Sequence, residues 1–222
     1  MGYVFKIFYK PKEVFEGIKE DKAKWIYPFI LVIIGAVIVF LLSRFLTFDL
    51  YIEKVKESLS KLPPEQQEQA LENVKKFGFI SGIISVIVFT PVTLLIISAV
   101  VYIFTTFFAL NVDFKKIFTL ITYAQLISII GGIITILTIS LTDNIYAGFH
   151  LGLLSSVKKG KLFYTLRIID IFTLWKLFIW AEGLSFIANV KKSKSYIIVG
   201  ILFVLYLVIF GLLLGKGAGF SI

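Results

Sequence analysis

The stretch WIYPFILVIIGAVIVFLLS, Trp25 to Ser43, contains 19 residues without a charge and is bounded by Lys24 and Arg44. About 20 apolar residues in a helix span the hydrocarbon core of a bilayer. Trp25 and Tyr27 at its start are residue types that concentrate at the membrane–water interface. The stretch therefore predicts a transmembrane helix at about residues 25–45.

The chain contains further apolar segments of this kind. Residues 77–112 carry no charge over 36 positions, about 50 Å as a helix, against a hydrocarbon core of about 30 Å. Because Pro91 lies inside this run, we expect one kinked, tilted or projecting helix rather than two crossings. The predicted fold class is an all-α polytopic membrane bundle with about five spans. These lie at about residues 25–45, 77–110, 117–141, 166–187 and 196–214.

Residues 1–24 form a separate amphipathic segment. Pro11 suits the first turn of a helix, and Val14, Phe15 and Ile18 then recur at helical spacing among Lys and Glu. The pattern is typical of a helix lying in the membrane interface, or of one packed on its own protein. Its charges are scattered, so a cleaved signal peptide is not expected.

Residues 49–76 are polar and separate the first two spans. Val55, Leu59 and Leu62 form a short apolar edge, and Pro63 and Pro64 interrupt the helical pattern. This segment predicts an extramembrane helical hairpin. Together with the five spans it belongs to one membrane domain, residues 25–222.

Composition supports a membrane protein that contacts anionic lipid. Of the 222 residues 58% are hydrophobic, and the net charge is +9, with a mean hydropathy of +0.93. The basic residues form short clusters between apolar runs, which favours lipid head groups over nucleic acid as their partner. Candidate head-group contacts are Lys115, Lys116, Lys191, Lys192 and Lys194. The chain has no Cys and one His, so we expect no metal and no cofactor.

Orientation follows from the positions of these lysines. Five spans place the two termini on opposite sides of the membrane, and the basic residues of the two faces are equal in number. The clusters at 115–116 and 191–194 lie in short loops next to spans, where positive charge favours the cytoplasm. We therefore predict a cytoplasmic N-terminus. The preference for Lys over Arg and the lack of Cys suit a prokaryotic cytoplasmic membrane.

The predicted fourth span carries three charges, at Asp170, Lys176 and Glu182. Ionisable residues inside a membrane are costly unless they are paired or hydrated. Spaced six residues apart, they point in three directions and cannot neutralise one another within one helix. Asp170 and Glu182 could approach opposite interfaces while Lys176 snorkels or pairs across helices; alternatively, the three form an ion-pair switch or a proton or substrate path.

Two other groups of polar residues are candidates for a functional role. Thr119, Thr122, Gln125 and Ser128 form a polar stripe on the third span, suited to helix packing or to a polar pathway. His150 lies in an uncharged stretch too short to cross the bilayer, where we expect it to be an interfacial polar tip rather than a ligand.

The sequence DIFTLW, Asp170 to Trp175, followed by Gly183 and Leu184, resembles the signature of the Yip-one domain family of Ypt/Rab-interacting membrane proteins. Weaker similarities lie at Pro11, Phe15 and Ile18, and at Asp113, Phe114, Lys116, Tyr123 and Ala124. The resemblance implies five helices, a cytosolic N-terminus and, in eukaryotic members, adaptor roles in trafficking; roles of prokaryotic members are poorly defined. Ile127, Lys176 and Glu182 depart from the family pattern.

No pattern of catalytic or phosphate-binding residues is present, so we predict no enzyme activity. The leading hypothesis is a membrane scaffold or adaptor that assembles with itself or with other membrane proteins and engages anionic lipid. Small GTPases are expected as partners only if the chain is eukaryotic. The alternative is a small transporter, channel or lipid-moving protein. Its candidate intramembrane residues are Asp170, Trp175, Lys176, Glu182 and Gln125.

Overall fold

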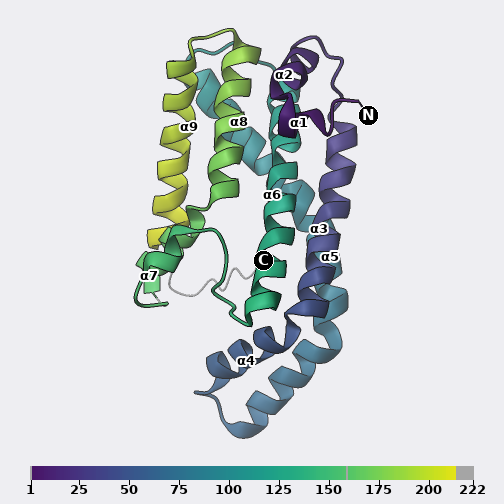
Figure 1. Cartoon of the computed structure of the whole chain (residues 1–222), viewed down its shortest axis with the longest axis vertical. Coiled ribbons are helices and arrows are strands. Elements are labelled where there is room, and N and C mark those ends of the chain that lie inside the picture. The colour runs from purple at the N-terminus through teal and green to yellow at the C-terminus, as the bar shows by residue number, and fades with distance from the viewer. Residues whose placement is uncertain (1, 159, 214–222) are drawn as a thin grey trace.

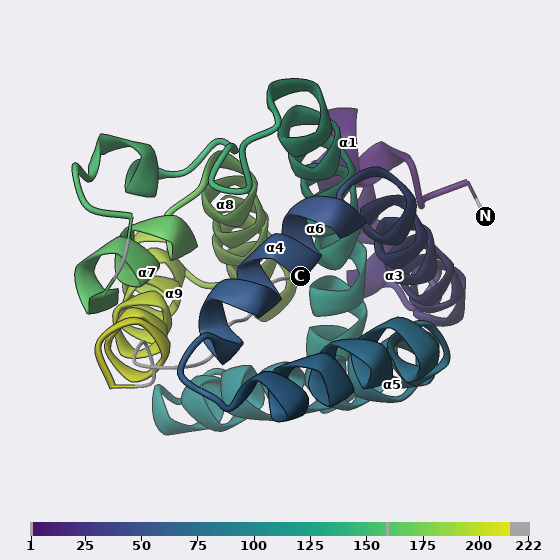
Figure 2. The same cartoon turned by 90° about the horizontal axis from the view of Figure 1, so that it is seen from below.

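Five long apolar helices dominate the computed structural model, which describes residues 2–158 and 160–213. They run alternately up and down in one bundle, and no strand occurs in the described residues (Figures 1 and 2). The all-α, five-span prediction is confirmed. The helices are α3 (Ile26–Leu46), α5 (Pro64–Phe107), α6 (Phe114–Thr142), α8 (Ile171–Ala188) and α9 (Lys192–Tyr206), which continues into the π-helical turns of η2 (Leu207–Leu213).

Helix α6 is the centre of the bundle, because α3, α5 and α8 all pack against it. Tyr123 and Ile127 on α6 are fully buried. Helices α6 and α8 can approach closely because Gly131 and Gly183 have no side chain. A Cβ on Gly131 would lie 2.6 Å from the Phe172 ring. A Cβ on Gly183 would overlap Leu120. Small residues therefore set the α6–α8 contact.

The N-terminal segment folds onto the bundle as α1 (Lys6–Tyr9) and α2 (Pro11–Lys19), and Pro11 begins α2 as predicted. The apolar face of α2, including Val14, Phe15 and Ile18, is buried, mainly against α8. Of the two interpretations that the sequence leaves open, the buried face of α2 favours a helix packed on its own protein.

The predicted hairpin is formed by α4 (Phe48–Leu59) and the first turns of α5. The two helices meet at residues 60–63. No boundary occurs near residue 77: α5 runs unbroken through Pro91 for 44 residues, about 66 Å. One helix therefore supplies both the second span and half of the hairpin, which projects from the lower end of the bundle in Figure 1.

The predicted fourth span, 166–187, begins too early. A short helix, α7 (Gly160–Ile168), ends before Asp170, and α8 starts afresh at Ile171. The break is held by backbone hydrogen bonds from Leu151 to Ile169 and from Ile171 to Phe149. Residues 143–158 and 160–170, including the 3-10 turn η1 (Leu151–Leu154), thus lie at the hairpin end, whereas the N-terminal segment lies at the opposite end.

Candidate functional site

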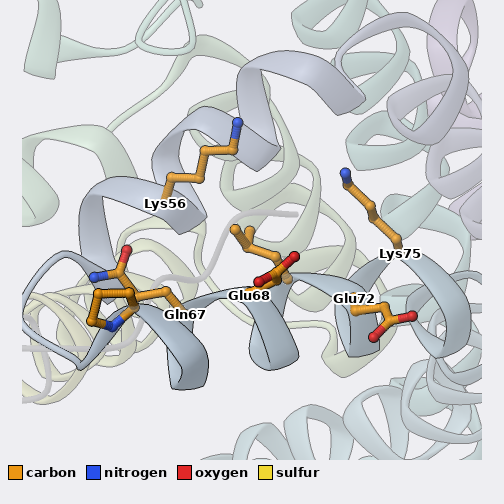
Figure 3. A pocket seen from close by; sticks show the side chains of 7 residues that line it. Lys56, Gln67, Glu68, Glu72 and Lys75 are labelled. Atoms are coloured by element: carbon orange, nitrogen blue, oxygen red, sulfur yellow. The ribbon is translucent and has the colours of Figure 1, made fainter.

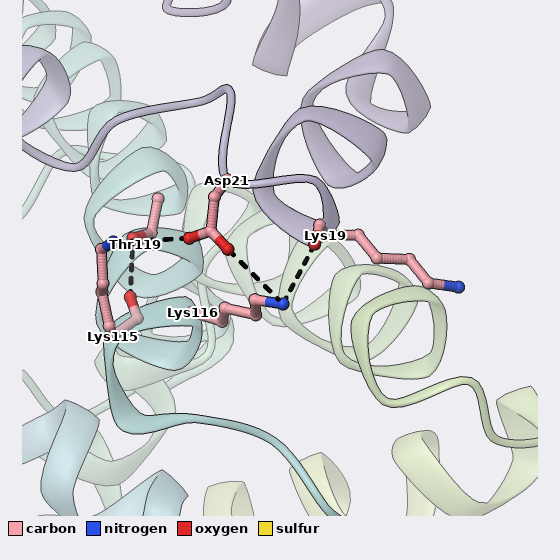
Figure 4. Close-up of polar contacts among 5 residues, drawn as sticks. All are labelled: Lys19, Asp21, Lys115, Lys116 and Thr119. Carbon is pink, nitrogen blue, oxygen red and sulfur yellow. Dashed lines mark hydrogen bonds and ion pairs between the residues drawn. The ribbon is translucent and has the colours of Figure 1, made fainter.

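A cluster of lysines lies at the end of the bundle that also holds the N-terminal segment, and Asp21 is at its centre. Lys115 Nζ lies 3.4 Å from one Asp21 oxygen and Lys116 Nζ 3.9 Å from the other. Lys116 also donates to the Lys19 carbonyl at 3.0 Å, at the C-terminus of α2 (Figure 4). These contacts fix the N-terminal segment to the start of α6. We call this region the lysine-rich end.

The α8–α9 turn brings the second lysine cluster to the same end. Lys192 Nζ donates to Glu182 at 2.8 Å, and the Tyr196 hydroxyl donates to the other Glu182 oxygen at 2.9 Å. Lys191 is exposed and Lys194 is half-buried. Three of the five candidate head-group lysines, Lys115, Lys116 and Lys192, therefore already contact acidic side chains of the protein.

Lys176 lies within α8 and has no carboxylate at ion-pair distance among the described residues. It is half-buried, and its Nζ lies 5.8 Å from the centre of the Trp180 ring, within the range of a cation–π contact. The indole nitrogen of Trp180 is buried, and no hydrogen-bond partner for it occurs in the part of the chain that the structure describes. Lys176 and Glu182 thus differ in their surroundings: Lys176 lies beside an aromatic ring, whereas Glu182 pairs with Lys192 at the lysine-rich end.

Asp170 lies at the start of α8 rather than inside a helix. Its carboxylate accepts hydrogen bonds from the backbone nitrogens of Phe172 at 2.9 Å and Thr173 at 3.0 Å, and also from the Thr173 hydroxyl. An aspartate in this position satisfies backbone donors that would otherwise be unpaired. Among the described residues, Arg167, three residues earlier, forms no ion pair with this carboxylate.

The remaining candidates are separate from these charges. Trp175 packs edge-on against Phe8 of α1, with 6.1 Å between ring centres. Gln125 is half-buried and forms no hydrogen bond with the described residues, while Thr119 and Thr122 donate to carbonyls one turn earlier in α6. The two threonine hydroxyls of the stripe are thus satisfied by their own helix, which favours packing over a polar pathway.

His150 is more buried than its sequence position suggested. Both ring nitrogens are buried without a hydrogen-bond partner in the described residues. Desolvation lowers the pKa of His150 below its usual value, and the charge of nearby Arg167 lowers it further. The local sequence does not indicate that His150 is buried, because a backbone bridge joins its segment to Asp170, twenty residues later.

A cleft of about 680 Å³ lies between α4 and α5 in the projecting hairpin. Figure 3 shows Lys56 on one side and Gln67, Glu68, Glu72 and Lys75 on the other. Its walls carry charges of both signs. The described residues contain no group of three or more His, Asp or Glu that could hold a metal.

The sequence matches the Yip1 domain over residues 5–215, nearly the whole chain. The chain belongs to the Yip1 family. No curated protein and no solved structure shows significant similarity to it.

The positions that resemble the Yip1 signature have structural roles in this chain. Asp170 caps α8, and Gly183 admits Leu120 of α6 and Phe15 of α2 to close contact. Tyr123 is buried, and its hydroxyl lies 3.4 Å from the Lys24 carbonyl. The departures differ from one another: Ile127 fills the core, Glu182 is paired with Lys192, and Lys176 has no acidic partner at ion-pair distance within residues 2–158 and 160–213.

Proposed function

We propose that this Yip1-family protein is a non-enzymatic membrane scaffold that binds anionic lipid at its lysine-rich end and assembles with itself or with other membrane proteins. The observation that supports lipid binding is the meeting of lysines from three distant segments at one end of the bundle. They come from the N-terminal segment, the start of α6 and the start of α9. Clusters of this kind attract anionic head groups.

The contacts within the cluster support a fixed surface rather than a flexible tail. Lys19 Nζ lies 5.4 Å from the centre of the Phe186 ring on α8, and Lys116 holds the end of α2. Lys12 and Lys191 remain exposed around these contacts. The lysine-rich end would face the cytoplasm, where anionic lipids are most abundant and short basic loops are favoured.

The projecting hairpin supports the assembly part of the proposal. It carries the mixed-charge cleft, whereas the lysine-rich end is predominantly basic. The two ends therefore offer different surfaces, one for lipid and one for polar contacts with protein. Cross-linking in native membranes should capture a second copy or another membrane protein, and a chain that stays monomeric and captures nothing would overturn this part.

Native mass spectrometry of the full chain from nanodiscs of phosphatidylglycerol and phosphatidylcholine tests the lipid part. We expect the anionic lipid to be retained above its bulk fraction, and the enrichment to fall in the variant Lys12→Gln/Lys191→Gln/Lys194→Gln. The matched control, Lys56→Gln/Lys61→Gln/Lys75→Gln, removes three lysines from the hairpin and should leave the enrichment unchanged. Retention at the bulk ratio, or equal loss in both variants, would overturn lipid binding at this end.

A second candidate function is a small transporter, channel or lipid-moving protein, favoured by Lys176 alone. An intramembrane lysine without a carboxylate partner is the kind of residue that marks a polar path. Flux or lipid scrambling in proteoliposomes that disappears with Lys176→Leu and persists with Lys194→Leu would support this function. If proteoliposomes show no more flux or scrambling than vesicles without protein, this second function is excluded.

A further inference from the structure

An apolar cavity of about 350 Å³ lies at the lysine-rich end, between α3, α5 and α6. This volume is near the lower limit of small-molecule pockets, about 300 Å³. One charged residue, Lys115, lies among aromatic and aliphatic side chains. The lining residues are Trp25, Phe29, Leu95, Phe114, Lys115 and Phe118.

The aromatic walls of the cavity support one another. The Trp25 ring meets Phe29 at 5.5 Å and Phe118 at 5.6 Å between centres, both edge to face, and Phe114 stacks on Phe118 at 6.2 Å. Such pairs are favourable beyond the area they bury. The rings are therefore held by one another, which preserves the cavity.

The position of the cavity in the membrane indicates what can enter it. Trp25 directly precedes α3, and Lys115 is in the first turn of α6, so the cavity opens near the level of the head groups. Leu95 on α5 is 48% exposed and contributes the lipid-facing rim. Bilayer lipid is the apolar molecule that reaches this rim without leaving the membrane.

We propose that the cavity binds an acyl-chain segment of an anionic phospholipid whose phosphate pairs with the Lys115 ammonium. The Lys115 side chain is 60% exposed, and the carboxylate that it contacts in the described part of the chain, Asp21 at 3.4 Å, is shared with Lys116. Its charge is therefore incompletely neutralised and open to a further anion. This inference deepens the proposed lipid binding and rests on it, but assigns a defined site for one lipid.

Quenching of Trp25 by brominated acyl chains tests the proposal. The chain has three tryptophans, so Trp175→Phe/Trp180→Phe leaves Trp25 as the reporter. In phosphatidylcholine nanodiscs with increasing brominated phosphatidylglycerol, we expect quenching that saturates at a low mole fraction, several-fold steeper than with brominated phosphatidylcholine. Lys115→Gln should make the two curves coincide, and Lys115→Arg should preserve the difference. Lys61→Gln, exposed on the hairpin and outside the cavity lining, should leave the difference unchanged.

Blocking the cavity covalently gives an independent readout. Because the chain has no Cys, a single introduced cysteine can be labelled selectively. A bulky maleimide on Leu95→Cys should abolish the selective quenching, whereas the same reagent on Leu137→Cys, an exposed position of α6 outside the cavity lining, should not. Circular dichroism verifies that each variant keeps its helix content.

The result that would overturn the cavity site is Trp25 quenching that is equal for the two lipids, or quenching by the anionic lipid that survives Lys115→Gln. If native mass spectrometry still shows anionic enrichment in that case, the cavity inference fails alone and the lipid-binding proposal stands. If both enrichment and selective quenching are missing, the two fail together.

Discussion

Lys192, the first residue of α9, donates a hydrogen bond of 2.8 Å to Glu182 of α8. The Glu182 side chain is 15% exposed and that of Lys192 is 65% exposed, so the pair joins a protected carboxylate to a hydrated ammonium. A charge that looked isolated on one helix is thus neutralised by the next helix of the bundle.

The Glu182–Lys192 pair should contribute modestly to stability, because water screens an ion pair with one exposed partner. In a double-mutant cycle of Glu182→Gln and Lys192→Met, we expect a coupling energy below about 1 kcal/mol. Denaturant unfolding in detergent, followed by circular dichroism, measures it. A coupling above about 2 kcal/mol would mean that the pair is more desolvated than this geometry implies.

The partner of Glu182 could not be predicted from spacing along one helix. Helical rotation predicts that Asp170, Lys176 and Glu182 cannot neutralise one another within one helix. It does not reveal the partner of Glu182, because Lys192 is ten residues further along the chain, after a turn. Its position depends on how α8 and α9 pack, which one sequence does not specify.

Asp170 should stabilise the start of α8 as a capping residue. Asp170→Ala removes the acceptor for two backbone donors and should cost about 1 kcal/mol, within the usual range for caps. Asp170→Asn keeps a side-chain oxygen and should cost clearly less. Unfolding of both variants under the same conditions provides the comparison, and equal losses would show that the charge rather than the cap matters.

The start of α8 was mispredicted because two local signals conflict. Residues 168–175 look like the inside of an apolar helix, which favoured a single span from Leu166. Asp170 followed by Thr173 is also a helix-start pattern, and the backbone bridge to residues 149–151 decides in its favour. By contrast, the long uncharged run of α3 has no competing signal, and its predicted bounds differ from the observed ones by one residue.

Gly183 should tolerate no larger residue, because a Cβ there would overlap Leu120 of α6 and lie 3.0 Å from the Phe15 ring. Gly183→Val should therefore destabilise the protein by about 1–3 kcal/mol, the usual cost of overpacking. Gly200→Val is the matched control, since no side chain lies within 4 Å of its Cβ position on α9. Thermal unfolding in one detergent should separate the two, and similar melting temperatures would contradict close α6–α8 packing.

His150 should make stability depend on pH below neutrality. Its folded pKa is lowered by desolvation and then by Arg167, so as pH falls below about 6.5 the unfolded chain binds the proton first. This contribution is fully present above that pH and is lost as the pH falls toward the folded pKa. The backbone of Tyr146 and then the charge of Asp170 oppose this lowering of the pKa, whereas Lys158 reinforces it.

We expect His150→Gln to reduce the difference in melting temperature between pH 7.5 and 5.5. The change should correspond to at most about 1 kcal/mol, less than the roughly 1.4 kcal/mol that one full pKa unit represents. Lys158→Gln provides a second check, because it removes a charge that disfavours the imidazolium. A wild-type difference that His150→Gln leaves unchanged would assign the pH dependence to other groups.

The orientation of the bundle is open to direct labelling, because the chain lacks Cys. Ser58 lies exposed on the hairpin and Ser193 lies exposed at the lysine-rich end, on opposite sides of the five spans. With a cytoplasmic N-terminus, an impermeant maleimide added to intact cells should label Ser58→Cys at once and Ser193→Cys only after permeabilisation. The reverse pattern would invert the orientation and place the lysine-rich end outside the cell. Labelling of both from one side would contradict an odd number of crossings between them.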